Sequence, residues 1–452
     1  MTAETSITER FADFSVSLKY EDLPAEVVRA AKHAILDLIG VALVGSHERS
    51  TRMVLESTIE DGNGGSSSII GTPLVASSAA AALVNGYAAH ALDYDDTYHE
   101  GKMHVSVAVL PAALVMSEAM HAPGKDLIAA YVVGYEISSR LGRVCSFGTH
   151  LSHRGVHATG FLGHFGALAA AGKLLGLDRP QMKRGLGITG TLAAGLVRSF
   201  GNMCYAMSAA NAAQDAVVSA RLAQRGFTGP DDILDGEGSI FAVHDGRTDP
   251  AQLLSRLGEQ FGICGNTIKI YACAGWRNPI IEGVIHLSNI HKLSPQDVAA
   301  VRVFVWPELM RLPNYSEPRT SQEGKFSAEH AAAVALIDRA GGNEQFTDAR
   351  VADPDLAAVR NKISVEGDER LGPWQTRIAI QTVDGRELVH AIPAQKGSPG
   401  SPLSWDEVKA KFDANAMTVL PRHQADRLAA TIHELEALDD TAQLMQLCRR
   451  DA

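Results

Sequence analysis

Apolar residues in the first 265 positions recur at helical spacing, and runs that alternate apolar with polar residues, as strands do, are few. Alanine, leucine, valine and glycine dominate these segments. Gly176 follows one segment and Pro180 opens the next, as is typical of a helix end and a helix start. Helices are predicted over 25–44, 77–92, 105–120, 124–141, 157–175, 180–194 and 209–225. This part of the chain is therefore predicted to be an α-helical domain.

The pattern changes near Thr267, where short β-type runs begin to alternate with helical segments. Strands are predicted over 301–305, 362–365 and 376–380, and helices over 279–291, 327–340 and 353–361. A Gly/Pro-rich segment, 397–402, then indicates a loop. The helical pattern returns over 405–414 and 422–447, so this end of the chain is expected to pack back on the first domain.

Composition narrows the class of protein. The 452 residues are 46% apolar and 21% charged, as in globular proteins and unlike disordered ones. The net charge of −11, with no long Lys/Arg run, argues against a nucleic-acid surface. No segment reaches 18 apolar residues free of charge, and the first residues are acidic where a signal peptide is basic. We therefore expect neither a membrane span nor a secretory leader.

Five cysteines are scattered through the chain without CxxC spacing. Their odd number fits neither a disulfide framework nor a structural zinc site. A reducing cytoplasmic location is the expectation.

Small residues crowd the segment 155–171, where four glycines precede a run of alanines interrupted by one leucine. Glycine inside a helix costs about 0.5–1 kcal/mol relative to alanine, so a compensating gain is expected. Close contact between helices is one such gain. Approach of a ligand to the helix backbone is the other, and the sequence leaves both open.

The densest polar cluster spans 90–104 and holds Asp93, Asp95 and Asp96 between two apolar helical segments. Their mutual repulsion needs relief by solvent, a cation or hydrogen-bond donors. Three interpretations remain open: a solvated acidic loop, a metal site, and an active-site loop in which a carboxylate orients a histidine. The spacing is not that of a calcium loop, and no HExxH motif supports zinc.

His104 and His157 each stand at the start of a predicted helix. The positive end of a helix dipole disfavours a charged imidazole, so each ring could accept a proton near neutral pH, although a capping or packing role is equally compatible with the pattern. Lys269 and Lys325 are candidates to hold a carboxylate, with Arg277 and Arg319 as weaker ones, and each could equally be a surface cation.

The chain resembles the MmgE/PrpD family, which includes 2-methylcitrate dehydratase, cis-aconitate decarboxylase and iminodisuccinate epimerase. The resemblance rests on the stretches HALDYDDT at 90–97, His104 followed by VLPAA at 109–113, YVVGYE at 131–136, HATG at 157–160, GFTGP at 226–230 and KFS at 325–327.

The resemblance implies a mainly α fold. A large all-helical domain (1–266, with 403–452 packing back on it) would carry a smaller α+β lid domain (267–402), with the active site between them. It further implies a homodimer without a metal or organic cofactor. By motif position the active-site residues would be Asp93, Thr97, His104, His157 and Lys269.

Several positions depart from the family pattern. Tyr205 and Ser208 lie in the stretch where many relatives have Lys-Pro-x-His-x-Gly, and His330 stands where an aromatic residue is expected after Lys325-Phe326-Ser327. Gly275 and Asn278 replace an arginine and a histidine, and Val105 replaces the proline of His-Pro-Ser. Fewer cations predict a substrate less charged than methylcitrate or cis-aconitate, because a charge-assisted contact contributes about 1.5–3 kcal/mol. We expect Thr97, Tyr205, Ser208, Lys325 and His330 to bind substrate.

These features favour a cofactor-independent lyase that dehydrates a small hydroxy-carboxylate. One of His104 and His157 would take the proton from the carbon next to the carboxylate, and the other would protonate the departing hydroxyl. Asp93 would orient one of them, and Lys269 would hold the carboxylate. An epimerase using two bases, a decarboxylase, and a non-catalytic paralogue that only binds remain alternatives.

Overall fold

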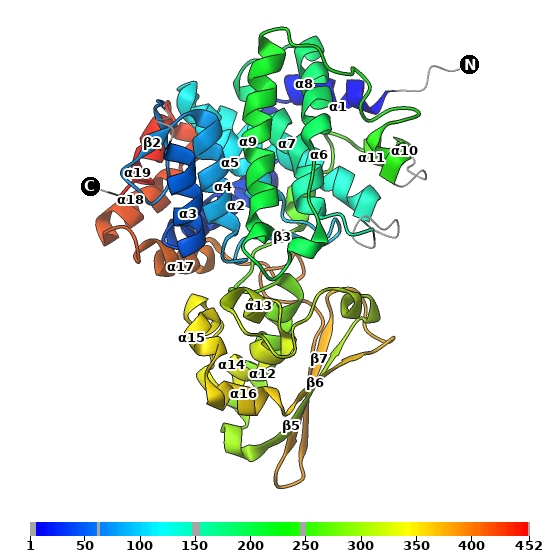
Figure 1. Cartoon of the computed structure of the whole chain (residues 1–452), viewed down its shortest axis with the longest axis vertical. Coiled ribbons are helices and arrows are strands. Elements are labelled where there is room, and N and C mark those ends of the chain that lie inside the picture. The colour runs from blue at the N-terminus through cyan, green and yellow to red at the C-terminus, as the bar shows by residue number, and fades with distance from the viewer. Residues whose placement is uncertain (1–5, 61–63, 147–153, 245–249, 451–452) are drawn as a thin grey trace.

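The computed structural model describes residues 6–60, 64–146, 154–244 and 250–450. Figure 1 shows two bodies joined at a narrow waist, a larger helical body above and a smaller one with a sheet below. The helical body contains α1 (Ile7–Ser17), α2 (Ala25–Gly45), α3 (Arg49–Ile59), α4 (Ser78–His90), α5 (Val105–Ala119), α6 (Gly124–Ser146), α7 (Ala158–Leu174), α8 (Arg179–Leu192), α9 (Cys204–Gln224), α10 (Ile240–His244) and α11 (Pro250–Leu254), with the two-residue strands β1 (Ser67–Ser68), β2 (Val75–Ala76), β3 (Thr97–Tyr98) and β4 (Asn266–Thr267). The fold is mainly helical, as predicted.

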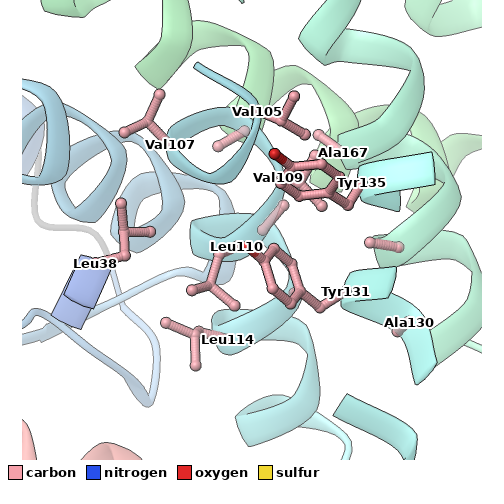
Figure 2. Close-up of a cluster of buried hydrophobic side chains, with 14 of the residues drawn as sticks. Leu38, Val105, Val107, Val109, Leu110, Leu114, Ala130, Tyr131, Tyr135 and Ala167 are labelled. Carbon is pink, nitrogen blue, oxygen red and sulfur yellow. The ribbon is translucent and has the colours of Figure 1, made fainter. Parts of the chain in front are cut away.

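Helices α5 and α7 form the centre of the helical body, and their residues are buried almost throughout. Figure 2 shows Val109, Leu110 and Leu114 of α5 packed against Tyr131 and Tyr135 of α6. A helix buried on every side needs apolar residues all round, which explains why the segment lacks the one-sided pattern of a surface helix.

The glycines of α7 lie at contacts between helices. A methyl group added at Gly163 would lie 2.5 Å from Cβ of Ala108 on α5, and one at Gly160 would lie 2.7 Å from Cβ of Ser208 on α9. The structure therefore favours close helix packing as the gain that offsets their cost.

Helix α9 begins at Cys204, five residues before the predicted start at 209. The backbone N–H of Cys204 donates to Oδ1 of Asn202 at 2.9 Å, which satisfies one of the open donors at this helix end. The earlier start places Tyr205 and Ser208 on the first turns of α9, instead of in a preceding loop.

The lid contains α12 (Asn278–Ile290), β5 (Val298–Val305), α13 (Ser321–Lys325), α14 (Ala328–Asp338), α15 (Asp348–Val351), α16 (Pro354–Arg360), β6 (Ile363–Gly367), β7 (Thr376–Thr382) and β8 (Glu387–Ile392). The strand order is β6-β5-β7-β8, with β5 parallel to β6 and the other pairs antiparallel. Strand β8 was not predicted, because Leu388, His390 and Ile392 give only a weak alternation. Figure 1 shows the helices on one side of this sheet.

The last helices, α17 (Trp405–Ala416), α18 (Arg422–His433) and α19 (Ala442–Leu447), lie beside the helical body. Lys411 of α17 pairs with Asp37 of α2 at 2.6 Å in a buried contact. The helix predicted over 422–447 is two helices, because Asp440 accepts from the backbone N–H of Ala442 and starts α19 there.

The two largest apolar clusters follow the two bodies: one joins residues 7–270 with 403–448, and the other lies mostly within 272–392. The expected domain limits, 1–266 with 403–452 and 267–402, remain a prediction. Within the described residues, no helix combines the length and the apolar character needed to cross a bilayer.

Candidate active site at the seam

A pocket that opens to solvent lies where the lid meets the helical body. The helical body contributes Thr97, Lys102, His104, His157, Phe200 and Tyr205 to its wall. The lid side contributes Trp276, Arg277, Leu312, Pro313, Phe326 and Trp374. The pocket therefore brings together two of the histidines, and the threonine and tyrosine, that the sequence singled out.

The two histidines meet because each precedes a central helix. His104 caps α5 and His157 caps α7, and both have extended backbone angles. The backbone N–H of His104 donates to Oγ1 of Thr159 in the first turn of α7 at 3.0 Å, so the two helix starts are held together.

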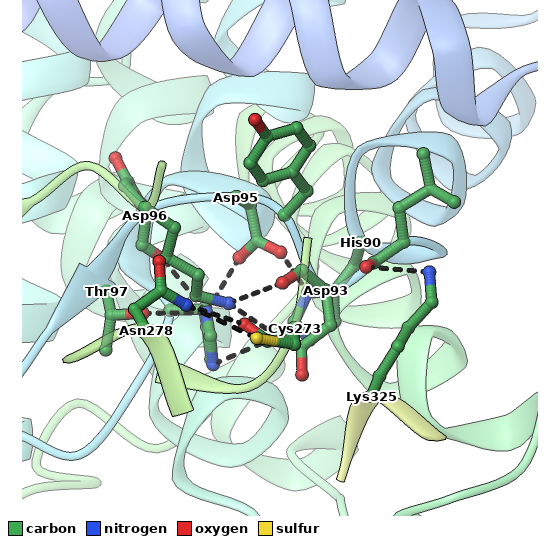
Figure 3. Close-up of polar contacts among 12 residues, drawn as sticks. His90, Asp93, Asp95, Asp96, Thr97, Cys273, Asn278 and Lys325 are labelled. Atoms are coloured by element: carbon green, nitrogen blue, oxygen red, sulfur yellow. Dashed lines mark hydrogen bonds and ion pairs between the residues drawn. The ribbon is translucent and has the colours of Figure 1, made fainter. Parts of the chain in front are cut away.

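Asp95 bridges two imidazoles in the loop after α4 (Figure 3). Its Oδ1 lies 2.9 Å from Nδ1 of His90, and its Oδ2 lies 2.7 Å from Nδ1 of His104. Burial works to raise the pKa of Asp95, but the neighbouring charges of His90 and His104 outweigh it and hold the pKa well below its usual range. The ring of His104 is thus held on this side by the Asp95 carboxylate and by the backbone carbonyl of Asp96, which lies 2.9 Å from the same Nδ1.

Asp93 pairs with Lys269 at 2.5 Å, and both side chains are buried. Lys269 also donates to the backbone carbonyl of Asp93 at 2.8 Å. Burial works to lower the pKa of Lys269, but the charges of Asp93 and Asp95 outweigh it and raise the pKa. A buried ion pair of this kind tolerates the loss of one partner poorly, at a cost of about 3–5 kcal/mol.

Tyr205 lies between these groups and the pocket. Its hydroxyl is 3.2 Å from Nε2 of His104 and 3.5 Å from Oδ1 of Asp93. Burial, with the charge of Asp93 second, raises the pKa of Tyr205 well above its usual value, so the hydroxyl keeps its proton. The Tyr205 hydroxyl and Nε2 of His104 therefore lie within hydrogen-bond distance of each other at the wall of the pocket.

Asp96 has no cationic partner among the described residues. Its Oδ2 accepts hydrogen bonds from Ser106 at 2.5 Å and from Asn266 at 2.6 Å, while its Oδ1 is buried without a partner there. Burial raises the pKa of Asp96 to about 7. The three aspartates thus occupy three different environments, which explains how the loop tolerates them.

His157 is fully enclosed by protein apart from its edge on the pocket. Its Nδ1 lies 2.7 Å from Oγ of Ser208, and that hydroxyl donates to the backbone carbonyl of Tyr205 at 3.2 Å. A hydroxyl that donates to a carbonyl accepts with its oxygen, and this arrangement favours the tautomer of His157 with the proton on Nδ1 and the lone pair on Nε2. Burial, reinforced by the nearby His90 and His104, lowers the pKa of His157 well below its usual value.

The atoms that could ligate a metal in His90, Asp95 and His104 lie within 4.8 Å of one another. Two imidazole nitrogens and one carboxylate form a donor set that suits divalent transition metals. The contact of 2.9 Å between His90 and Asp95 is that of an ordinary hydrogen bond, and the contact of 2.7 Å between His104 and Asp95 is an ion-pair distance. That no metal takes part remains a prediction.

Two residues of the lid, Arg277 and Trp374, are fixed in the pocket wall by contacts of their own. The guanidinium of Arg277 is buried beside the ring of Trp276 and donates to the backbone carbonyls of Pro313 and Phe326. Burial lowers the pKa of Arg277 to about 9, which leaves it charged at neutral pH. Trp374, on the loop between β6 and β7, stacks on His99 of the helical body with ring centroids 4.0 Å apart.

Several predicted site residues lie outside the pocket wall. Lys269 contacts Asp93, and Ser208 contacts His157. Lys325 donates to the backbone carbonyl of Leu92 at 2.9 Å (Figure 3), so it links the lid to the helical body. His330 is buried in the lid, where its nitrogens lie 2.9 Å from the carbonyl of Gln345 and 3.2 Å from Arg360. The structure does not bring His330 to the pocket.

The sequence interpretation did not assign His90, Asp95 or Trp374 to the site, and it ranked Arg277 only as a weak candidate for holding a carboxylate. His90 and Asp95 stood within the noted polar cluster, so their five-residue spacing across a helix end was an available signal. Trp374 had none, because it reaches the site only through the folding of the lid.

Two family models match the chain: the MmgE/PrpD N-terminal domain over residues 9–253 and the MmgE/PrpD C-terminal domain over residues 271–437. The chain is 27% identical to the "Cis-aconitate decarboxylase-like protein oryM" of Aspergillus oryzae, over 99% of this chain and 98% of that protein. It is also 27% identical to the cis-aconitate decarboxylase of Mus musculus (98% and 93% covered) and 26% identical to that of Homo sapiens (98% and 95% covered). The first model alone spans more than half of the residues, and the chain belongs to the MmgE/PrpD family.

Proposed function

We propose that this protein is a lyase that dehydrates a small hydroxy-carboxylate, with His157 as the base and the His104–Tyr205 pair as the acid. The observation that carries the proposal is the position of His157, whose Nδ1 lies 2.7 Å from Oγ of Ser208 and whose ring borders the same pocket as Tyr205. The contact with Ser208 favours the tautomer that leaves a lone pair on Nε2. The two groups come from different helices and border the same pocket, as a base and an acid on one substrate must.

In this mechanism Nε2 of His157 takes the proton from the carbon next to the carboxylate. Negative charge then grows on the carboxylate oxygens, where the Arg277 guanidinium can stabilise it. The C–O bond at the next carbon breaks, and the hydroxyl leaves as water with a proton from Tyr205, which is replenished from His104. The products are an alkene acid and water, with a proton left on His157.

Asp93 and Lys269 act indirectly in this scheme. Their buried ion pair holds Asp93 3.5 Å from the Tyr205 hydroxyl, and Asp95 holds His104. These residues position the acid without touching the substrate. This assignment differs from the sequence-based expectation that Lys269 holds the substrate carboxylate, because Arg277 borders the pocket and Lys269 does not.

Decarboxylation is the second candidate, and the names of the relatives favour it. In that reaction the bond between the carboxyl carbon and its neighbour breaks, carbon dioxide leaves, and the electron pair takes a proton from the Tyr205–His104 pair. The apolar wall of the pocket is compatible with it, since desolvation of a carboxylate disfavours the charged ground state.

Proton NMR in deuterated water separates these reactions. Purified protein is incubated with a panel of 2- and 3-hydroxycarboxylates and unsaturated carboxylates. Dehydration gives an alkene with the carbon count unchanged, decarboxylation removes one carbon, and epimerisation exchanges the hydrogen without an alkene. His157→Gln should lower turnover by about 10²–10⁴-fold, while His286→Gln, on the exposed side of α12, should not.

Full activity of the His157→Gln protein would rule out the proposed base. No reaction with any member of the panel, in a folded protein, would favour the non-catalytic alternative.

A further inference from the structure

The wall of the pocket is mainly aromatic and aliphatic. Phe200, Tyr205, Trp276, Phe326 and Trp374 contribute rings from both bodies. The rings of Phe200, Tyr205 and Phe326 contact one another, with centroids 4.9 to 5.4 Å apart. A wall of this kind gains free energy by covering apolar surface and gains nothing from a charged group.

Positive charge in the wall is concentrated at Arg277. Among the described residues, no carboxylate lies within ion-pair distance of its guanidinium, whose Nε is buried without a partner there. A buried cation without a carboxylate partner is stabilised when an anion binds beside it. The wall also holds Lys102, which is half-buried and lies 5.8 Å from the ring centroid of Trp306 of the lid.

A substrate with several carboxylates would bring more negative charge into this pocket than the wall can balance. With Arg277 and Lys102 as the Lys/Arg side chains of the wall, a third carboxylate would have to lie against aromatic rings, and burying an unpaired charge is costly. An apolar group in the same place would cover ring surface and displace water instead.

The backbone conformation of Trp374 also indicates that this wall is a ligand site. Its φ is +64°, a left-handed conformation that is rare for a large side chain. The ring is nevertheless held in the wall, stacked on His99 with an angle of 15° between the planes. Strained conformations of this kind persist where the surrounding structure fixes them, commonly at ligand sites.

We propose that the pocket takes carboxylic acids with a single carboxylate, held by Arg277, and an aryl or bulky alkyl group that packs among the rings. The proposal rests on the proposed function for the position of the carboxylate beside His157. It names the substrate class as aryl or alkyl monocarboxylates, in place of tricarboxylates.

Calorimetric titration of the full chain with three probes tests this class. Cinnamate has the ring and the carboxylate, cinnamyl alcohol has the ring alone, and cis-aconitate has three carboxylates. Cinnamate should bind about ten- to hundredfold more tightly than either of the others, because only cinnamate satisfies both the guanidinium and the rings. Trp374→Ala should weaken cinnamate binding by about tenfold and leave cis-aconitate unaffected.

Arg277→Gln should reduce the affinity for cinnamate to that for cinnamyl alcohol, with Arg302→Gln, an exposed lid variant paired with Glu387, as the control. If Arg277→Gln fails to fold, the Trp374 variant and the three probes still decide. Equal or tighter binding of cis-aconitate, or no cinnamate binding at millimolar concentration, overturns the proposal.

Turnover of 3-hydroxy-3-phenylpropanoate, followed by NMR, separates the two proposals. Tight cinnamate binding without reaction of this acid or of any other aryl or alkyl acid supports the ligand class and contradicts the lyase. Reaction of a tricarboxylate without cinnamate binding supports the lyase and contradicts the ligand class.

Discussion

Ser208→Ala removes the group that fixes the tautomer of His157. In the native protein the Ser208 hydroxyl lies 2.7 Å from Nδ1 of His157 and donates to the carbonyl of Tyr205 at 3.2 Å, which favours a proton on Nδ1. Alanine leaves the helix and the packing of its Cβ in place. The variant therefore tests whether a serine that does not line the pocket acts through the histidine that does.

The expected loss follows from the burial of His157, which is 3% exposed. A buried N–H without an acceptor costs about 1–3 kcal/mol. The ring can avoid this cost only by moving the proton to Nε2, which removes the lone pair from the pocket. Either way the active form is disfavoured by that amount, and at 1.36 kcal/mol per tenfold in rate, kcat should fall by about 5- to 150-fold.

Two measurements check this prediction. Steady-state kinetics, on an acid found to react in the NMR screen, should show a lower kcat with KM little changed, since Ser208 does not border the pocket. Nitrogen-15 NMR of labelled histidines needs no substrate: His157 should show one tautomer in the native protein and a mixture or the other tautomer in the variant.

Ser219→Ala is the matched control, because Ser219 lies on the same helix and is fully buried, and its hydroxyl has no partner among the described residues. Removing an unbonded hydroxyl should leave activity unchanged. Native kcat in Ser208→Ala, or equal losses in the two variants, would refute the role of Ser208.

Three further predictions concern protonation and packing. The pKa of Asp96 is raised to about 7, so the folded state loses stability as pH rises from about 4 to 7, by about 4 kcal/mol at most. Asp96→Asn should remove this loss. In urea unfolding, the free energy of unfolding of the variant relative to that of the native protein should increase by about 2 kcal/mol between pH 5 and pH 7. Parallel pH dependence in the two proteins would contradict it. Gly160→Ala would place a methyl group 2.7 Å from Cβ of Ser208. Both kcat and the stability of the fold should therefore fall, the stability by about 1–3 kcal/mol in thermal or urea unfolding. A variant with native stability and activity would contradict the packing argument. Because the pKa of His157 is lowered, the acid limb of kcat/KM should lie below pH 6.5, and a limb at or above that value would argue against His157 as the base.

Much of the fold follows from local patterns. Helices α2 and α5 begin at Ala25 and Val105, as the apolar segments predicted, because uniformly apolar stretches bounded by polar residues have few alternatives. The start of α9 was less predictable. The Asn202 side chain accepts from the N–H of Cys204, the first helical residue, and a sequence pattern does not distinguish that asparagine from one in a loop.

The site was predictable only where its residues share a segment. His104 and Asp93 lie in one polar cluster, and His157 follows the same helix-start pattern. Lys269 was the stronger sequence candidate and Arg277, eight residues later, the weaker one, yet Arg277 borders the pocket and Lys269 pairs with Asp93. Which cation faces the ligand depends on side-chain direction at the seam, and that is fixed by the packing of the lid on the helical body.

His330 also shows that the direction of a side chain could not be predicted from a motif. Its backbone N–H donates to Oγ of Ser327, so it occupies the third position of α14. Its ring packs against Phe346, with centroids 5.4 Å apart, in the interior of the lid. The motif correctly places a helix start beside the pocket, but three residues along, the helix has turned His330 away from it.

The partners of the two imidazoles explain why their roles should differ although both cap a helix. His104 has the Asp95 carboxylate on one nitrogen and the Tyr205 hydroxyl near the other, so a charge on its ring is balanced and its proton has a path to the pocket. His157 has only a serine hydroxyl, and burial keeps its ring neutral. Environments that separate two similar groups are how one site holds an acid and a base at the same pH. Exchange of the two roles would require a carboxylate beside His157, and among the described residues none lies within ion-pair distance of it.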